Sequence, residues 1–492
     1  MQSKFFPQIK IHHVLAAILF LGLVLRCWNI TQSFWWDEIW STMAYATAPA
    51  VWTIMKSLGY YFNNHVLYSL MAHGSIKLLG EREVAARLPA VIMGLVGIVV
   101  AFQFFRKYLG DWCALIAAFL LAVSAFHIDH STEARGYSGL ALGALLSSLY
   151  FLQALSSNTT SRWLLYVLWT ALGCYMQIFM IMVCAAQLFF LMIVVLSRKG
   201  GFPVQQFDPK AYHHFCVALL CAAVVTVILY APILPTFLTN MGKVRLVNVS
   251  RMPFLTNLLK SMLPGIDTPL GSIMYCITIC GGLYGIFKKN SIFAIYLLTI
   301  IFFPLILYLS LNPMFMFERY FIFALPFVLL TVGAGIVFFS QHLLQRYKTG
   351  FVFLCVLLIC SIQIPSIKTV LTQDRQNYRE ALQFIEQAGI SQDTDLVFSI
   401  GYAGEHFKYY AHHTAIIFPE NLQKLSEMAA GKQRLWCLIT AWLPAMRPPH
   451  EDRELYSEQP GQVEIYNYVK QHFQLKKLYS SKFPVEIFYW EK

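Results

Sequence analysis

Apolar runs of about 20 residues recur along the chain, and no other feature restricts its fold as much. A helix of that length crosses the hydrocarbon core of a bilayer. The chain has 492 residues, of which 58% are hydrophobic. A water-soluble protein of this length has too few polar side chains to cover so much apolar surface. The sequence therefore predicts a polytopic α-helical membrane protein.

The apolar runs predict about eleven transmembrane helices. The first run lacks a small-residue cleavage pattern, so we interpret it as an anchor and not as a signal peptide. Between the first two spans, short amphipathic pieces at 51–58 and 65–79 predict helices that lie in the membrane interface. The predicted spans are 11–27, 88–105, 112–126, 139–155, 163–179, 181–196, 215–234, 273–287, 292–311, 321–339 and 351–367.

The composition becomes polar after about Lys368. Helical patterns then alternate with strand patterns, for example at 395–400 and 434–440, which is typical of a small α/β domain. We therefore predict a transmembrane domain over residues 1–367 and a C-terminal soluble α/β domain over residues 368–492.

Loop charges predict the orientation in the membrane. If the N-terminus is cytoplasmic, the inner segments carry twelve basic residues and only two acidic ones, Asp111 and Asp208. This asymmetry follows the positive-inside rule. The C-terminal domain and the polar motifs described below would then lie on the outer, extracytoplasmic side. We expect a plasma membrane, namely the inner membrane of a bacterium.

Several classes of protein fit poorly. The net charge of +12 is scattered over many loops without a compact basic patch, which disfavours nucleic acid as a partner. The sequence has neither a P-loop nor a GxGxxG motif, so no nucleotide cofactor is expected. Its polar motifs lie at the ends of spans, whereas transporters bind substrates near the membrane midplane. Transport or lipid flipping is therefore the less favoured alternative.

The first candidate site is Asp37-Glu38, within the aromatic stretch 34–40 that follows the first span. Aromatic side chains of this kind favour the membrane interface. Carboxylates among them are partly desolvated, which increases their basicity. The alternative is a helix start, because acids in a first turn complement the helix dipole.

Two more polar motifs lie at the predicted outer ends of spans. In the segment 127–137, we predict that Glu133 and Tyr137 share one face of a helix that enters the membrane. His127, Asp129 and His130 form a weak signature for a divalent metal, and the alternative is a polar loop before an N-capped helix.

The other motif is Glu318-Arg319-Tyr320, at the start of the tenth span. Arg319 could grip a phosphate with its planar fork, or extend to lipid head groups. Arg87, at the start of the second span, has the same two interpretations. A further cationic group comprises Lys243, Arg245 and Arg251, for which a solvated loop is the alternative.

Taken in order, these motifs resemble those of the integral-membrane (GT-C) glycosyltransferases related to protein O-mannosyltransferases and to the lipid A aminoarabinose transferase. The resemblance extends over the membrane part and the C-terminal domain. At His65 the chain has Asn-His-Val-Leu-Tyr where the family usually has His-Pro-Pro-Leu-Tyr. The matching motifs are Asp37-Glu38, residues 64–68, Arg87-Leu88-Pro89, residues 133–137 and Arg319-Tyr320.

The resemblance implies an enzyme that transfers a hexosyl or pentosyl group from a polyprenyl-phosphate donor. The acceptor would be a lipid, glycan or protein outside the membrane. Asp37 would be the general base, with Glu38 beside it, and a single displacement would invert the anomeric carbon. A ligase that moves a whole glycan is the alternative enzyme, and some relatives use a divalent metal. The substrate-binding residues implied by the motifs are His65, Arg87, Glu133, Arg135, Tyr137, Arg319 and Tyr320.

Overall fold

The computed structural model describes residues 10–57, 63–199, 207–241, 251–311, 316–342, 347–400, 404–411, 414–440, 460–479 and 484–492. The chain divides into two compact units. Unit one comprises Met1–Ile30 and Ala48–Leu371, and unit two comprises Thr31–Thr47 and Thr372–Lys492. The segment that contains Asp37 and Glu38 therefore belongs to the same unit as the C-terminal residues.

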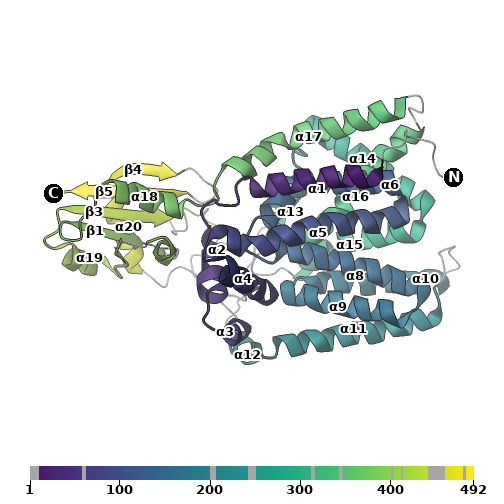
Figure 1. Cartoon of the computed structure of the whole chain (residues 1–492), viewed down its shortest axis with the longest axis horizontal. Helices are drawn as coiled ribbons and strands as arrows, with labels where there is room; N and C mark the ends of the chain where they lie inside the picture. Colours follow the sequence, from purple (N-terminus) through teal and green to yellow (C-terminus); the bar gives the residue numbers. More distant parts are fainter. Residues whose placement is uncertain are drawn as a thin grey trace. The chain divides into compact units, whose positions relative to one another are not determined.

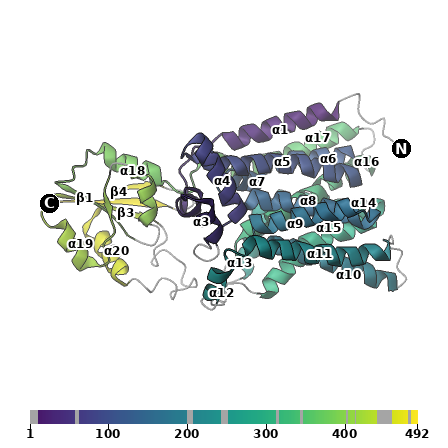
Figure 2. The ribbon, with the colours of Figure 1, turned by 60° about the horizontal axis from the view of Figure 1, so that its bottom comes forward.

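Unit one is a bundle of long apolar helices (Figures 1 and 2). Within the described ranges, eight helices are long and apolar enough to cross a membrane, and the bent pair α6–α7 would make nine. The eight are α5 (Glu83–Leu109), α8 (Tyr137–Ser157), α10 (Met180–Lys199), α11 (Pro209–Tyr230), α14 (Pro269–Lys289), α15 (Ser291–Leu311), η3 with α16 (Glu318–Ala324 and Leu325–His342) and α17 (Lys348–Thr372).

All eleven predicted spans overlap helices of unit one, so the polytopic helical fold is confirmed. The sequence predicts eleven spans and eight of the described helices are long enough, because the α6–α7 span is broken and because α1 (Ile11–Cys27) and α9 (Thr160–Met176) have only 17 residues each. The pieces predicted to lie in the interface are helical as α3 (Val51–Lys56) and α4 (Val66–Leu79). Among the described residues, this unit also contains α12 (Leu234–Met241) and α13 (Arg251–Met262).

The third predicted span is broken, where the sequence predicted one helix. α6 (Asp111–Val123) meets α7 (Ala125–Ser131) at an angle of 61°. Ser124 has an extended backbone, and its hydroxyl accepts a hydrogen bond from the His127 backbone N–H. The buried guanidinium of Arg26 donates to the Ala122 carbonyl at 3.2 Å and contacts His127 Nδ1 at 2.6 Å. Arg26 of helix α1 thus supplies a donor for a carbonyl at the break. Helix α7 contains the first residues of the 127–137 motif.

Helices α14 and α16 cross with their backbones in contact, because glycines lie at the crossing. A Cβ atom on Gly335 would lie 1.8 Å from the Thr278 carbonyl oxygen, and one on Gly282 would lie 1.9 Å from that of Thr331. The two helices can approach this closely only while both positions lack a side chain.

We expect Gly335→Ala to destabilise the protein by about 1–3 kcal/mol, because the added methyl group forces the two helix backbones apart. The measurement is the free energy of unfolding, or the melting temperature, of the purified protein in detergent. Gly350→Ala is the matched control, because a Cβ there meets no atom within 4 Å. Equal melting of the two variants would contradict this helix crossing.

Unit two contains a mixed β-sheet (Figure 1). The sheet has five strands in the order β2-β1-β3-β5-β4. Strands β1 (Asp395–Ile400), β2 (Ile416–Ile417) and β3 (Arg434–Thr440) are parallel. β5 (Val485–Glu491) is antiparallel to β3 and to β4 (Gln474–Tyr479). The central strands β1 and β3 are almost wholly buried, as expected for parallel strands covered on both faces.

Helices cover this sheet and complete its core. α19 (Leu422–Ala429) and α20 (Pro460–His472) contribute Leu425, Ile465 and Val469 to an apolar cluster with β1 and β3. The described C-terminal residues also include α18 (Tyr378–Gln387) and the 3-10 helix η5 (Gly404–Tyr409). A C-terminal α/β fold is therefore confirmed.

Candidate functional site

The Asp37-Glu38 pair lies on the short helix α2 (Trp36–Ser41), which continues as a π-helical turn over Thr42–Ala46. Both carboxylates are buried: Asp37 is 8% exposed and Glu38 is fully buried. Glu38 Oε2 accepts a hydrogen bond from the Trp35 backbone N–H at 3.3 Å, so Glu38 caps its own helix. The helix-start interpretation therefore describes Glu38, and Asp37 is left as the candidate base.

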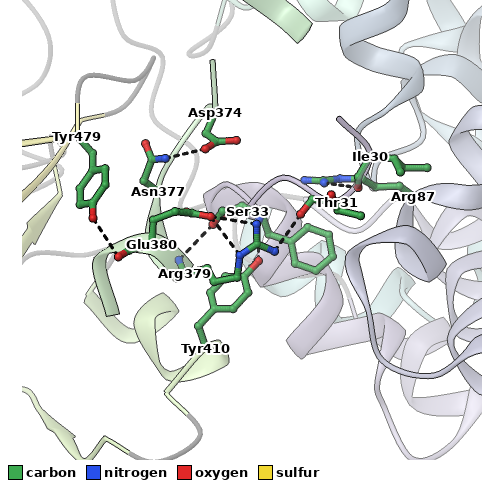
Figure 3. A network of polar contacts seen from close by, with 11 residues as sticks. Ile30, Thr31, Ser33, Arg87, Asp374, Asn377, Arg379, Glu380, Tyr410 and Tyr479 are labelled. Carbon is green, nitrogen blue, oxygen red and sulfur yellow. Dashed lines mark hydrogen bonds and ion pairs between the residues drawn. The ribbon is translucent and has the colours of Figure 1, made fainter. Parts of the chain in front are cut away.

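Residues of the C-terminal part hold the segment before α2. Phe34 N–H donates to Tyr410 Oη at 2.8 Å, and Trp36 N–H donates to Gln376 Oε1 at 3.0 Å. The Arg379 guanidinium donates to the Thr31 carbonyl at 2.9 Å (Figure 3). Sequence patterns do not indicate these contacts, because they join residues about 340 or more positions apart.

Unit one contains a second group of candidate residues, which we call the arginine–histidine cluster: His65, Glu133, Arg135, Tyr137 and Arg319. The guanidinium carbons of Arg135 and Arg319 lie 5.9 Å and 5.8 Å from the centre of the Tyr137 ring. The His65 ring meets the Tyr137 ring edge-on at 5.1 Å. Two arginines that are 184 positions apart in sequence thus face one buried aromatic ring.

His65 connects two parts of this cluster. Its Nδ1 accepts the Gly136 backbone N–H at 2.8 Å, and its Nε2 lies 3.2 Å from Arg135 Nη2. Burial, with Arg135 and Arg319 nearby, lowers the pKa of His65 well below its usual range, against the opposite effect of Glu133. The ring is therefore neutral at pH 7. With Nδ1 as the acceptor, its proton lies on Nε2, beside the Arg135 guanidinium.

The arrangement suits an anion. A neutral imidazole N–H and a guanidinium are both hydrogen-bond donors, and they lie side by side. An anionic oxygen could accept from both, and charge-assisted bonds of this kind are the stronger ones. Arg135 is oriented by Asn63, whose backbone carbonyl accepts from Nη1 at 3.0 Å and whose side-chain oxygen accepts from Nη2.

Glu133 balances part of the positive charge. Its Oε2 lies 2.8 Å from His130 Nδ1, and both side chains are buried. The sequence predicted that Glu133 and Tyr137 share a helix face, which is wrong. Residues 132–136 form a tight turn between α7 and α8, with Arg135 N–H donating to the Glu133 carbonyl. This turn brings Arg135 close to Tyr137, although a helix would have separated them.

The two remaining candidates are Tyr320 and Arg87. Tyr320 stacks on Phe179 with ring centres 4.0 Å apart. Arg319, its neighbour, lies over the Phe317 ring at 4.2 Å. Arg87 is fully buried and donates to the Ile30 carbonyl at 2.8 Å (Figure 3), so it fixes the chain at the end of unit one that precedes α2.

The proposed metal signature does not gather around one point. His127 contacts Arg26, whereas His130 contacts Glu133. In the part of the chain that the structure describes, no three His, Cys, Asp or Glu residues form a group suited to a metal. Of the alternative cationic group, Lys243 and Arg245 lie outside the described residues, and Arg251 is exposed at the start of α13.

Sequence reasoning missed two groups of neighbours: Asn63, which holds Arg135, and the residues Gln376, Tyr410 and Arg379, which hold the Asp37 segment. It named His130 only as a possible metal ligand, whereas His130 contacts Glu133. Asn63 adjoins the Asn-His-Val-Leu-Tyr motif and His130 lies inside the 127–137 motif, so proximity to a motif was an available signal. The C-terminal residues carried no such signal.

Comparisons with known proteins find related membrane glycosyltransferases. Residues 65–202 match the model of the dolichyl-phosphate-mannose-protein mannosyltransferase family. ArnT from Cupriavidus metallidurans bound to undecaprenyl phosphate is similar in structure, with a TM-score of 0.58 and 11% identity over 97% of each chain. The apo oligosaccharyltransferase of Archaeoglobus fulgidus has a TM-score of 0.53 and 13% identity, over 88% of this chain and 70% of that one. Curated protein sequences give no match.

These similarities establish the fold. The chain has the architecture of the integral-membrane GT-C glycosyltransferases, in both its helical part and its C-terminal part. The resemblance predicted from the ordered motifs is thereby confirmed, and the chain is an integral membrane protein. The family match begins at His65 and includes Arg87, Glu133, Arg135 and Tyr137.

Proposed function

We propose that this protein is a glycosyltransferase that moves a sugar from a polyprenyl-phosphate donor to an acceptor hydroxyl on the outer face of the membrane. The observation that carries the proposal is the arginine–histidine cluster, where Arg135, Arg319 and His65 surround one buried tyrosine ring. A phosphate suits this set of donors, and a polyprenyl chain suits a protein surrounded by lipid. One similar structure contains undecaprenyl phosphate, and another contains dolichol phosphate.

The chemistry we propose is a single displacement. Asp37 takes the proton of the acceptor hydroxyl, which requires an approach of about 3 Å. The acceptor oxygen forms a bond to the anomeric carbon as the bond from that carbon to the phosphate oxygen breaks. The electron pair leaves with the polyprenyl phosphate, and Arg135 and Arg319 stabilise the charge that grows on it. One displacement at the anomeric carbon inverts its configuration.

A direct test uses the purified protein in detergent or liposomes, with short-chain polyprenyl-phosphate sugars as donors. We expect transfer of a hexose or pentose to a lipid, glycan or peptide acceptor without an added nucleotide sugar. The product anomer, determined by NMR, should have the configuration opposite to that of the donor. Retention of configuration would contradict the single displacement.

A glycan ligase is the second candidate. The similarity to an archaeal oligosaccharyltransferase, which extends over 88% of this chain, favours it. The same assay separates the two enzymes when a lipid-linked oligosaccharide competes with a lipid-linked monosaccharide as donor. We expect the monosaccharide to be used, and a strict preference for the oligosaccharide would establish the ligase.

The proposed outer location of the C-terminal part can be tested by cysteine labelling. Cys437 is its only cysteine, and it is fully buried, so an exposed thiol must be introduced. Ser426→Cys, at an exposed position of α19, should react with a membrane-impermeant maleimide in intact cells. Thr349→Cys, exposed near the start of α17, should react only after permeabilisation. The parent protein provides the background labelling, and the reverse pattern would overturn the predicted orientation.

A further inference from the structure

The segment that carries Asp37 belongs to unit two, although α1 immediately precedes it in sequence. Unit two combines Thr31–Thr47 with Thr372–Lys492. Residues that form hydrogen bonds with this segment lie at three places in the C-terminal part: Gln376 before α18, Arg379 within α18, and Tyr410 after η5. A small domain that only tethered the chain would not require three separate contacts to one short loop.

Three of these hydrogen bonds are made to backbone groups of the loop. Gln376 and Tyr410 accept the N–H groups of Trp36 and Phe34, while Arg379 donates to the Thr31 carbonyl. The Arg379 backbone N–H also donates to Ser33 Oγ at 3.3 Å. Bonds to backbone groups fix the path of the chain whatever its side chains are. They therefore set the position at which α2 begins, one residue before Asp37.

Aromatic packing also supports this segment. The His406 ring meets the Trp36 ring edge-on at 5.8 Å and lies 6.0 Å from the Trp40 ring. Trp36 and Trp40 are four residues apart, so they lie on one helix face. Asp37 therefore lies on a helix whose first residue is held by a hydrogen bond and whose tryptophan face contacts His406.

We infer that the C-terminal domain contributes to catalysis by holding the helix that carries Asp37 in position. Gln376 and Tyr410 are the positioning residues. The inference rests on the proposed role of Asp37 as the base. A general base acts only within hydrogen-bonding distance of its proton, and small displacements of a reacting group lower the rate greatly. The domain would therefore influence turnover without touching either substrate.

Two substitutions remove one contact each while keeping the size of the side chain. Gln376→Met deletes the oxygen that accepts the Trp36 N–H, and Tyr410→Phe deletes the hydroxyl that accepts the Phe34 N–H. Each has a matched control in the same domain. Asn377→Leu deletes a neighbouring amide that donates to Asp374, and Tyr479→Phe deletes a hydroxyl that donates to the Glu380 carbonyl (Figure 3).

The first measurement is hydrogen–deuterium exchange of the full-length protein, which needs no activity. We expect exchange in the peptide that contains Phe34 and Trp36 to be roughly 2- to 10-fold faster in Gln376→Met and Tyr410→Phe, as loss of one ordinary hydrogen bond predicts. The two controls should leave this peptide unchanged. Unchanged exchange in both test variants would overturn the inference, even if the proposed function were correct.

The second measurement is the kinetics of sugar transfer. We expect kcat to fall in Gln376→Met and Tyr410→Phe while KM for the donor is retained, because the donor phosphate is bound elsewhere. Gln376→Glu keeps an acceptor oxygen and should recover most of the rate. Faster exchange with a kcat equal to that of the controls would show that the loop is held but not positioned for catalysis, and would overturn the inference. Failure of the parent protein to transfer any sugar would contradict the proposed function and leave the exchange result intact.

Discussion

Asp37→Asn should lower the rate of sugar transfer by about 10²- to 10⁴-fold, which is the usual contribution of a general base. An amide has the shape of a carboxylate but cannot accept the proton of the acceptor hydroxyl. Asp37 is 8% exposed and lies in the first turn of α2, so the substitution retains the packing of the site. The measurement is kcat with a short-chain polyprenyl-phosphate donor, together with the affinity for that donor.

The matched control is Glu38→Gln, at the next position of the same helix. Glu38 caps α2 through a carboxylate oxygen, and the amide oxygen of glutamine can accept the same Trp35 N–H. We therefore expect Glu38→Gln to lower kcat much less than Asp37→Asn. Near-normal turnover by purified, folded Asp37→Asn would remove Asp37 as the base and leave both carboxylates as helix-start residues.

The same variant separates the enzyme from a flippase. An enzyme needs the carboxylate for turnover, whereas a flippase of a lipid-linked sugar does not need a base. Translocation of a labelled lipid-linked sugar across liposomes by both the parent protein and Asp37→Asn, without transfer, would favour the flippase.

Much of the fold could be predicted because it depends on local composition. The strand patterns at 395–400 and 434–440 coincide with β1 and β3, since short apolar runs bounded by polar residues indicate buried strands. The membrane helices follow from run length alone. The break at Ser124 does not, because neither proline nor glycine marks it. It depends on Arg26, which lies on another helix and supplies a donor to the Ala122 carbonyl.

The candidate site was predictable in its residues but not in its arrangement. Short motifs indicated His65, Arg135 and Arg319, yet nothing in the sequence places their side chains around Tyr137. The contacts of His65 and Arg319 with Tyr137 join residues 72 and 182 positions apart, and periodicity carries no information at that separation. The sequence also predicts a helix over 132–136, whereas the structure has a turn there that places Arg135 over the Tyr137 ring.

The second large effect concerns the donor phosphate. We expect Arg135→Lys and Arg319→Lys each to lower kcat/KM for the donor by roughly 10- to 150-fold, which corresponds to the loss of one charge-assisted hydrogen bond of about 1.5–3 kcal/mol. Lysine keeps the charge but replaces a planar fork with a single ammonium group, which cannot grip two phosphate oxygens. In Arg135, Nη1 and Nη2 both bond Asn63 and Nη2 also lies beside His65, an arrangement that an ammonium group cannot reproduce.

Acceptor affinity should change little in these variants, because the lost interaction is with the donor. Arg251→Lys is the matched control: it makes the same replacement at an exposed arginine at the start of α13, outside the arginine–histidine cluster. The measurements are donor kcat/KM, donor affinity and acceptor KM for each variant. If Arg135→Lys and Arg319→Lys use the donor as the parent does while Arg251→Lys does not, the two arginines are interfacial anchors. The phosphate would then be bound by the cationic group that includes Arg251.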